Sequence, residues 1–273
     1  MLTTINLTPR IGAEVRTDRK TLLEGSAAGE IRERLEERGV LVFRDVNFSD
    51  EEQLAFSQTL GALDTPGGKT MTKISLDKEE QKEAPYMVDY LRGSFYWHID
   101  GSTDDVPAFA TLLTARRLSE TGGHTEFANT YAAYDELPES EKEALAHVRV
   151  VHSLEAAQRY VSPEPSYAEL QGWRSRPAKT HPLIWTHKSG RKSLVLGATA
   201  SHVEGMDREE GTALLCRLRD WATQPQFVCQ HQWTLGDLLV WDNTGTMHRV
   251  TEYPLGSPRL MHRTSLLGEE AIA

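Results

Sequence analysis

The chain has 273 residues, of which 39% are hydrophobic and 26% charged, and its formal net charge is −10. This acidic balance argues against nonspecific nucleic-acid binding, which needs a basic surface. No apolar run approaches the roughly 20 residues of a transmembrane helix, and the first residues lack the pattern of a secretory signal. We therefore expect a cytoplasmic protein with neither a nucleic acid nor a membrane as partner.

The first elements in chain order are helical, with one short strand between them. Residues 27–38 predict a helix that Gly39 stops, and residues 40–43 (VLVF) predict a buried strand. Residues 49–52 (SDEE) form a capping box, so we expect a second helix from there to about Leu60.

Residues 62–92 form a polar stretch with Pro66, two glycines and a run rich in lysine and glutamate. A stretch of this length without clear periodicity is typical of a mobile loop. We therefore expect residues 62–92 to be a loop that acts as an active-site lid.

The rest of the chain predicts mainly strands. Two helical stretches stand out, 129–146 with a break at Pro138 and 206–221. Short strand-like runs are expected at 108–114, 125–128, 193–196, 227–232, 237–241, 246–250 and 259–267. This order does not alternate as a βαβ fold would. It predicts a mainly β protein, an antiparallel sandwich or jelly roll with helices packed outside.

The stretch FYWHIDGSTDD at 95–105 places His98 and Asp100 two residues apart. If this stretch is a strand, both side chains point to one face. The pair alone is compatible with half of a metal site, with a simple hydrogen bond or with chance.

His248 is the candidate third ligand, because it opens a strand after a tight turn in GDLLVWDNTGTMHRV. Two histidines and one carboxylate leave one side of a metal open, a donor set that favours iron(II) and suits oxygen with an organic cosubstrate. A three-ligand zinc hydrolase is the alternative at this point, as is a structural role for His248.

Arg259 and Arg263 are four residues apart in SPRLMHRTSLLG. On a strand both would point inward together with Met261, while His262 and Thr264 would point outward. Two inward guanidinium groups are unfavourable unless they meet anions, which favours a site for carboxylates. Salt bridges to internal acidic residues are the alternative.

The whole chain resembles the TauD/TfdA family of iron(II)- and 2-oxoglutarate-dependent dioxygenases. The resemblance lies in a series of blocks in the family's order: GVLVFRD at 39–45, WHID at 97–100, GGHTEFANTYAAYDEL at 122–137, HPLIWTHKSGRKSL at 181–194, GDLLVWDNTGTMHR at 236–249 and RLMHR at 259–263. It implies one domain over residues 1–273, with a double-stranded β-helix (a cupin-like jelly roll) as its core and helices around it.

The resemblance also implies the cofactors and the metal ligands. His98, Asp100 and His248 would hold Fe(II), and 2-oxoglutarate and O2 would be the cosubstrates. The implied reaction hydroxylates a small or medium organic anion (a carboxylate, sulfonate or sulfate ester) and releases succinate and CO2.

Other residues are given roles by the same resemblance. Thr125 and Arg259 would bind the distal carboxylate of 2-oxoglutarate, and Arg263 the anionic group of the primary substrate. Ser94 and Tyr96 share strand parity with His98, so we expect them to line the substrate pocket, although core packing is equally open for Tyr96. Taurine-handling members have asparagine where this chain has Ser94, which argues against taurine.

Three other functions stay open at this point. One keeps the cofactors but desaturates or oxidatively decarboxylates a fatty-acid-like substrate. Another is a metal-binding jelly roll or sensor without turnover, and the last is the zinc hydrolase. Relatives are commonly dimers or tetramers, so we expect a homo-oligomer.

Overall fold

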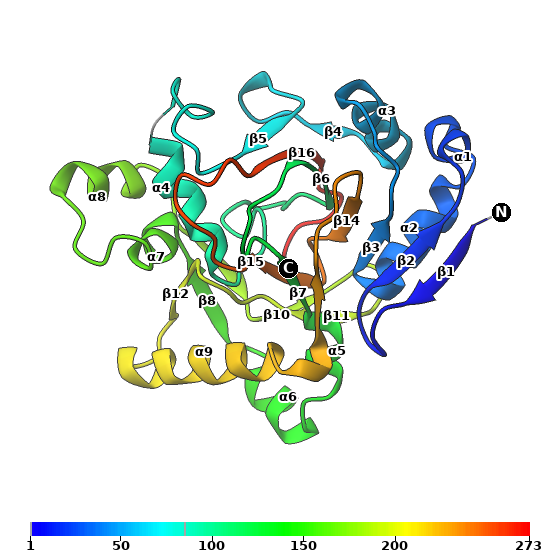
Figure 1. Ribbon diagram of the computed structural model, residues 1–273. Helices are drawn as coiled ribbons and strands as arrows, with labels where there is room; N and C mark the ends of the chain where they lie inside the picture. The colour runs from blue at the N-terminus through cyan, green and yellow to red at the C-terminus, as the bar shows by residue number, and fades with distance from the viewer. Residues whose placement is uncertain (1, 85) are drawn as a thin grey trace.

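The computed structural model describes residues 2–84 and 86–273 (Figure 1). Its helices are α1 (Arg19–Glu24), α2 (Ala28–Arg38), α3 (Asp50–Leu60), α4 (Tyr86–Arg92), α5 (Thr130–Asp135), α6 (Glu139–Leu145), α7 (Leu154–Arg159), α8 (Tyr167–Arg174) and α9 (Arg208–Ala222). In this part of the chain, no helix combines the length and the apolar character needed to cross a bilayer.

Strands are numerous and mostly short. They are β1 (Thr3–Asn6), β2 (Ala13–Arg16), β3 (Val40–Phe43), β4 (Leu63–Asp64), β5 (Thr72–Ile74), β6 (Ala110–Arg117), β7 (Thr125–Asn129), β8 (Arg149–His152), β9 (Lys179–Pro182), β10 (Ile184–Thr186), β11 (Lys192–Leu194), β12 (Ala200–Val203), β13 (Val228–His231), β14 (Leu238–Asp242), β15 (Thr246–Val250) and β16 (Leu260–Leu266).

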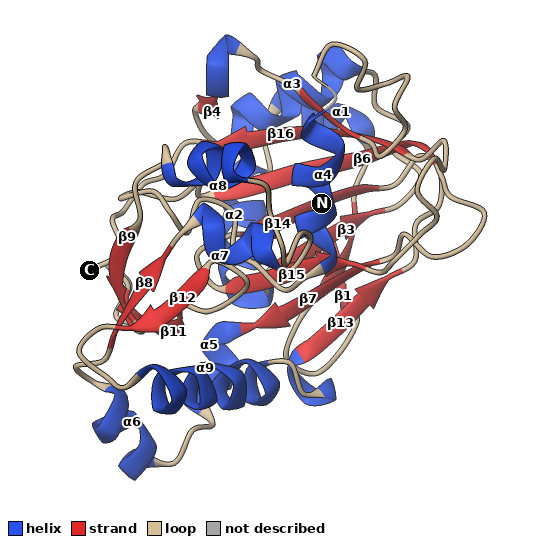
Figure 2. Ribbon diagram, turned by 90° about the vertical axis from the view of Figure 1, so that its left-hand side faces the viewer, coloured by secondary structure: helices blue, strands red, loops and turns tan. Residues whose placement is uncertain are grey.

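The core consists of two facing sheets. The large sheet has the order β1-β2-β3-β14-β6-β16-β4, with β5 also paired to β16, and the smaller sheet has the order β13-β7-β15. Phe127 of β7 packs on Trp241 of β14, with 5.5 Å between the ring centroids, which joins the two inner faces. Figure 2 shows these strands side by side, with helices outside them. This is the expected jelly roll with surrounding helices.

The central strands of the large sheet are buried on both faces because their side chains alternate between two cores. Leu41 of β3 and Val240 of β14 belong to the cluster that packs under α2 and α3. Val42 and Leu239 point the opposite way, into the cluster between the two sheets. Both strands therefore read as continuous apolar runs, as in any sheet covered on its two faces.

Helix α3 covers the outer face of β16. It begins with a capping box in which Ser49 and Glu52 satisfy each other's backbone N–H groups. On its inner side, the hydroxyls of Ser57 and Thr264 lie 2.7 Å apart, and His262 lies 2.8 Å from the Asp50 carboxylate. Thr264 and His262 thus point away from the space between the sheets, as the sequence predicts.

Two predictions about local structure need correction. Residues 62–92 are not an irregular loop, since they contain β4 and β5, both paired with β16, and helix α4. Residues 95–105 are not a strand, since a 3-10 turn ends at Phe95 and His98 makes only an isolated bridge to His248. β4 and β5 form because β16 pairs with them, whereas residues 95–105 pair with β15 at His98 alone. The local sequence pattern does not indicate whether a distant partner strand is present.

Candidate active site

A cavity of about 490 Å³ lies between the two sheets and the α4 and α7 helices. Its walls include most of the side chains that the sequence singles out: Ser94, His98, Asp100, Thr125, His248, Arg259 and Arg263. The structure therefore brings together residues that lie far apart along the chain. Tyr96 is the exception.

His98, Asp100 and His248 form the cluster at the base of this cavity. One potential ligand atom from each lies within 4.8 Å of those of the other two. The Nε2 atoms of His98 and His248 each lie 3.8 Å from an oxygen of Asp100. The Nδ1–H of His98 donates to the Tyr96 carbonyl at 2.8 Å, which leaves its Nε2 lone pair free toward the cluster.

Two backbone features hold this arrangement. His98 and His248 exchange backbone hydrogen bonds of 3.0 and 2.9 Å, so that the short stretch around His98 is fixed to the edge of β15. Gly197 packs directly behind His98, because a Cβ there would lie 2.9 Å from the His98 Cα and its φ is +114°. Sequence reasoning missed Gly197, which only the fold brings next to the WHID block.

The charge states of the cluster suit a divalent metal. Burial raises the pKa of Asp100, but Arg263, His248 and His98 outweigh it and hold that pKa at about 2. Burial, together with His98, lowers the pKa of His248 to about 3. At neutral pH the cluster thus offers an ionised carboxylate and a neutral imidazole, the forms that bind metals.

A buried hydrogen-bond chain orients Asp100. Thr111 donates to the Asp100 carboxylate at 3.3 Å, Asn243 donates to the Thr111 hydroxyl at 2.8 Å, and the Trp241 indole donates to the Asn243 amide oxygen at 2.8 Å. Such outer contacts fix a ligand's orientation. The sequence reasoning did not identify Thr111 or Asn243, since their link to Asp100 exists only in the folded sheet.

Arg259 is a buried guanidinium without a counter-ion among the described residues. It is 3% exposed, its Nε has no hydrogen-bond partner, and its Nη2 donates to the Gly123 carbonyl at 3.2 Å. Burial lowers the pKa of Arg259, and Tyr253 alone opposes that effect. A charge buried in this way is unfavourable until an anion joins it.

Thr125 lies in the same cavity and complements Arg259. Its hydroxyl oxygen accepts a hydrogen bond of 2.9 Å from the Trp233 indole. Because that contact uses an acceptor site, the hydroxyl proton of Thr125 is left to donate to a ligand. A carboxylate is the ligand that a guanidinium and a hydroxyl donor jointly favour.

Arg263 lies nearer the cluster of His98, Asp100 and His248 and is more accessible. Its Nη1 is 3.5 Å from the Asp100 carboxylate, its side chain is 30% exposed, and its Nε has no hydrogen-bond partner in the described part of the chain. Arg263 therefore retains donors for a second anion beside the cluster. An apolar part of the cavity wall comes from α4, α7 and β5, with Ile74, Met87, Leu91, Leu154 and Ala157.

Ser94 and Tyr96 do not behave alike. Ser94 lines the cavity, although its hydroxyl donates to the Leu91 carbonyl at 2.6 Å. Tyr96 turns away, contrary to the strand-parity prediction: its ring packs on Tyr160 with 4.8 Å between centroids, and its hydroxyl donates to the Tyr160 carbonyl. The parity argument fails because this stretch is not a strand.

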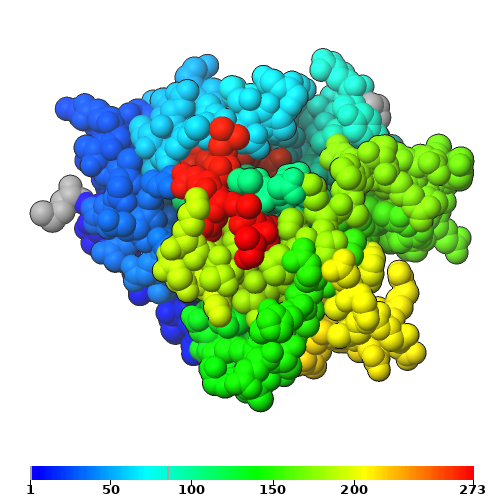
Figure 3. Space-filling view, turned by 180° about the vertical axis from the view of Figure 1, so that it is seen from behind, coloured from blue at the N-terminus to red at the C-terminus, as the bar shows by residue number. Residues whose placement is uncertain are grey.

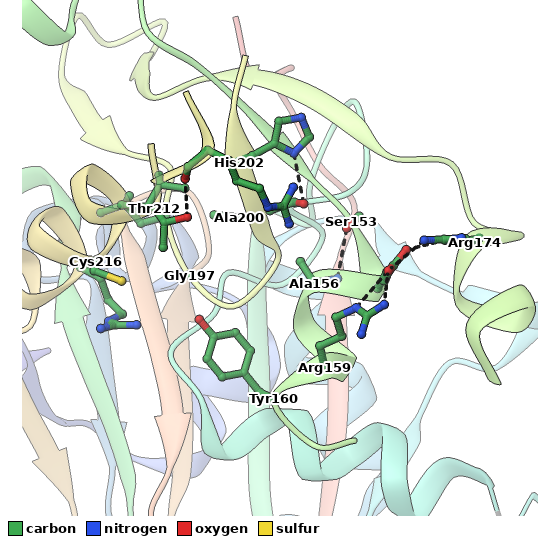
Figure 4. A pocket seen from close by; sticks show the side chains of 16 residues that line it. Ser153, Ala156, Arg159, Tyr160, Arg174, Gly197, Ala200, His202, Thr212 and Cys216 are labelled. Carbon is green, nitrogen blue, oxygen red and sulfur yellow. Dashed lines mark hydrogen bonds and ion pairs between the residues drawn. The ribbon is translucent and has the colours of Figure 1, made fainter. Parts of the chain in front are cut away.

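Tyr160 borders a separate surface hollow of about 420 Å³ between α7, α8 and α9 (Figure 4). Arg159 and Arg174 meet there on the shared carboxylate of Glu155. This hollow does not include the His98, Asp100 and His248 cluster, so the chemistry described above belongs to the cavity between the sheets.

Comparison with known proteins agrees with this geometry. A family model described as taurine catabolism dioxygenase TauD, TfdA family matches residues 3–265. An alpha-ketoglutarate-dependent 2,4-dichlorophenoxyacetate dioxygenase of Cupriavidus pinatubonensis is 34% identical, with 93% of each chain covered. An (S)-phenoxypropionate/alpha-ketoglutarate-dioxygenase of Delftia acidovorans is 31% identical and covers 98% of this chain and 97% of its own.

Solved structures lead to the same family. The crystal structure of AAD-2 in complex with Mn(II) and N-oxalylglycine superposes with a TM-score of 0.85 at 33% identity, and all of both chains is covered. A 2,4-D dioxygenase homologue from Burkholderia xenovorans gives a TM-score of 0.80 at 30% identity, with 98% of this chain and 97% of that one covered.

Proposed function

Because the chain belongs to the TauD/TfdA family of iron(II)- and 2-oxoglutarate-dependent dioxygenases, we propose that it hydroxylates a small or medium organic anion. The observation that carries this proposal is the position of Arg259. A buried guanidinium to which the described residues offer no counter-ion shares one cavity with a His–Asp–His cluster, and 2-oxoglutarate is an anion that meets both.

In this proposal His98, Asp100 and His248 hold the iron. The donor set fits iron(II), since two imidazole nitrogens and one carboxylate leave several positions of the metal open. When bound, the iron supplies the activation of O2 at the expense of 2-oxoglutarate, which leaves as succinate and CO2.

The roles of the remaining side chains follow from their contacts. Arg259 and Thr125 bind the distal carboxylate of 2-oxoglutarate, and this contact replaces the missing counter-ion of Arg259. Arg263 binds the anionic group of the primary substrate and orients the rest of the substrate toward the proposed metal ligands. Trp241 and the walls of the cavity exclude water from the reacting atoms.

Within the organic anions, we favour a carboxylate with an apolar body, such as an aryloxyalkanoic acid. The planar guanidinium of Arg263 suits a carboxylate, and residues of α4, α7 and β5 form an apolar part of the same cavity wall. Sulfate esters and sulfonates are the comparison compounds in a screen that measures succinate release. A screen in which sulfonates alone are turned over would contradict the preference for carboxylates.

We also propose that residues 62–92 act as a lid, that the protein is cytoplasmic, and that it is a homo-oligomer of two or four chains. The lid proposal is supported by the lining of the cavity, to which β5 contributes Ile74 and α4 contributes Met87 and Leu91.

Light scattering of the purified protein tests the proposed oligomeric state, and a monomer at micromolar concentration would reject it.

The experiment that tests the role of Arg259 is a binding titration with Mn(II) and N-oxalylglycine in the absence of turnover. We expect Arg259→Ala to weaken N-oxalylglycine binding by about a hundredfold, because a charged hydrogen-bonded pair contributes on the order of 3 kcal/mol. Arg263→Ala is the matched control, from the same cavity, and is expected to leave that affinity within about threefold. Equal losses in the two variants would refute the division of roles.

A further inference from the structure

The segment that follows β16, residues 267–273, lies at the centre of the face seen in Figure 3, where its red atoms stand out. Leu267 and Gly268 line the catalytic cavity. The backbone N–H of Leu267 donates to the Ala62 carbonyl at 2.8 Å, which attaches the start of the segment to the beginning of the 62–92 stretch.

This segment packs against the loop that carries Asp100. A Cβ on Gly268 would lie 2.2 Å from the carbonyl oxygen of Pro107, so the two backbones are in close contact. Four residues later, the N–H of Ile272 donates to the Asp105 carbonyl at 3.3 Å. The Ile272 side chain is 8% exposed and belongs to the largest hydrophobic cluster. Both ends of the segment therefore contact residues 101–107.

Glu270 fixes the middle of the segment to the turn between β10 and β11. Its carboxylate lies 2.5 Å from the Nδ1 of His187 and accepts the backbone N–H of Lys188 at 3.0 Å. His187 is buried, with its ring against Trp185 and Tyr131 at centroid distances of 4.3 and 5.0 Å. A charged hydrogen bond in such an enclosed place holds its partners firmly.

The same histidine continues the connection toward His248. Its Nε2 lies 2.8 Å from the Ser193 hydroxyl, which donates to the Thr244 carbonyl at 3.0 Å, in the turn that precedes β15. The contacts of His187 thus link a serine, Ser193, to a carboxylate, Glu270, in the order found in the catalytic triad of a serine hydrolase. However, Ser193 is only 1% exposed, so no substrate reaches its hydroxyl and the cluster is structural.

We infer that residues 267–273, which we call the clasp, position the metal site. The contact of Glu270 with His187 and the buried side chain of Ile272 hold the clasp in place. The clasp connects the loop after Asp100 with the turn before His248 and forms part of the cavity wall. Glu270 and His187 touch neither metal nor substrate, so they are positioning residues. The inference rests on the proposed role of Asp100 and His248 as iron ligands.

The test compares Glu270→Ala with Glu269→Ala, because both remove one carboxylate from the same segment. Glu269 is 51% exposed at its side chain and makes a surface ion pair of 2.7 Å with Arg32. Hydrogen exchange of the backbone amides in 101–106, and the dissociation constant for Mn(II) by electron paramagnetic resonance, are measured in the full chain. We expect Glu270→Ala to speed that exchange and to weaken Mn(II) binding, each by about tenfold, and Glu269→Ala to change neither.

Two outcomes would overturn the clasp. One is that Glu270→Ala loosens residues 267–273 while 101–106 and Mn(II) affinity stay as in the wild type. The other is that both variants act alike. If Glu270→Ala does not fold, Glu270→Gln keeps the shape and is expected to show the same pattern more weakly, and wild-type behaviour in it would reject the inference. A wild type that binds no Mn(II) would contradict the proposed function instead, and the exchange data would still report on the clasp.

Discussion

At the scale of single residues, the site depends on Arg259, whose buried guanidinium has no counter-ion among the described residues. Its position requires the absence of a side chain on Gly123. A Cβ there would lie 3.0 Å from the Arg259 Nε, and the φ of Gly123 is +72°. Gly123 is thus part of the binding site.

We predict that Gly123→Ala weakens 2-oxoglutarate binding by about tenfold, since the new methyl group pushes the guanidinium from its place. Gly190→Ala is the matched control, because Gly190 also has a positive φ, +85°, but a Cβ there would have no atom of the described residues within 4 Å. The dissociation constant for 2-oxoglutarate is measured by anaerobic titration in both variants. Equal effects would show that backbone strain alone is responsible.

His152 gives a pH prediction at the same scale. Burial, with His181 as a neighbour, lowers the pKa of His152 to about 3, below the value of about 6.5 for an exposed histidine. The folded state therefore binds this proton less readily than the unfolded state. The contribution of His152 to the free energy of unfolding is therefore full above about pH 6.5, and it is lost as the pH falls from there toward 3.

We expect the wild type to lose about 1 kcal/mol more stability than His152→Asn between pH 7.5 and 5.5. Urea unfolding at the two pH values measures it. Other buried histidines titrate in both proteins, so only the difference in stability loss between the wild type and His152→Asn reports on His152. The same loss in the variant would show that His152 is not the titrating group.

At the scale of elements, sequence reasoning succeeded where local signals determine the structure. The capping box at Ser49 predicts where α3 begins, and the strand VLVF and the break at Pro138 are confirmed. It failed at β4 and β5, whose short sequences form strands only because β16 pairs with them. The WHID block looks like a strand but pairs with β15 only at His98, so the strand-parity argument wrongly placed Tyr96 in the cavity between the sheets.

Capping boxes at two helices allow a matched prediction. Ser49→Ala removes the cap of α3, which packs on β16, and Ser166→Ala removes the equivalent cap of α8, which has no buried residue. We expect Ser49→Ala to lower the free energy of unfolding by about 1 kcal/mol and Ser166→Ala to lower it by less than half of that. Equal losses in urea unfolding would mean that packing does not couple the cap to global stability.

At the scale of the whole molecule, the fold explains why ligands from distant parts of the chain converge. Two sheets face each other, and each contributes side chains to one cavity. Composition and strand pattern predict this class of fold, and the resemblance to the family indicates the candidate ligands. Neither predicts the contacts that orient them, such as Thr111, Gly197 and the segment after β16, because these arise from tertiary packing alone.

The central claim is that His98, Asp100 and His248 hold an iron that 2-oxoglutarate chelates. Its most direct test adds iron(II) and then 2-oxoglutarate to the protein without oxygen and records the visible spectrum. We predict a weak metal-to-ligand charge-transfer band in the wild type that is absent in His248→Ala. A folded wild type without this band, or a variant with the same band, would contradict the claim.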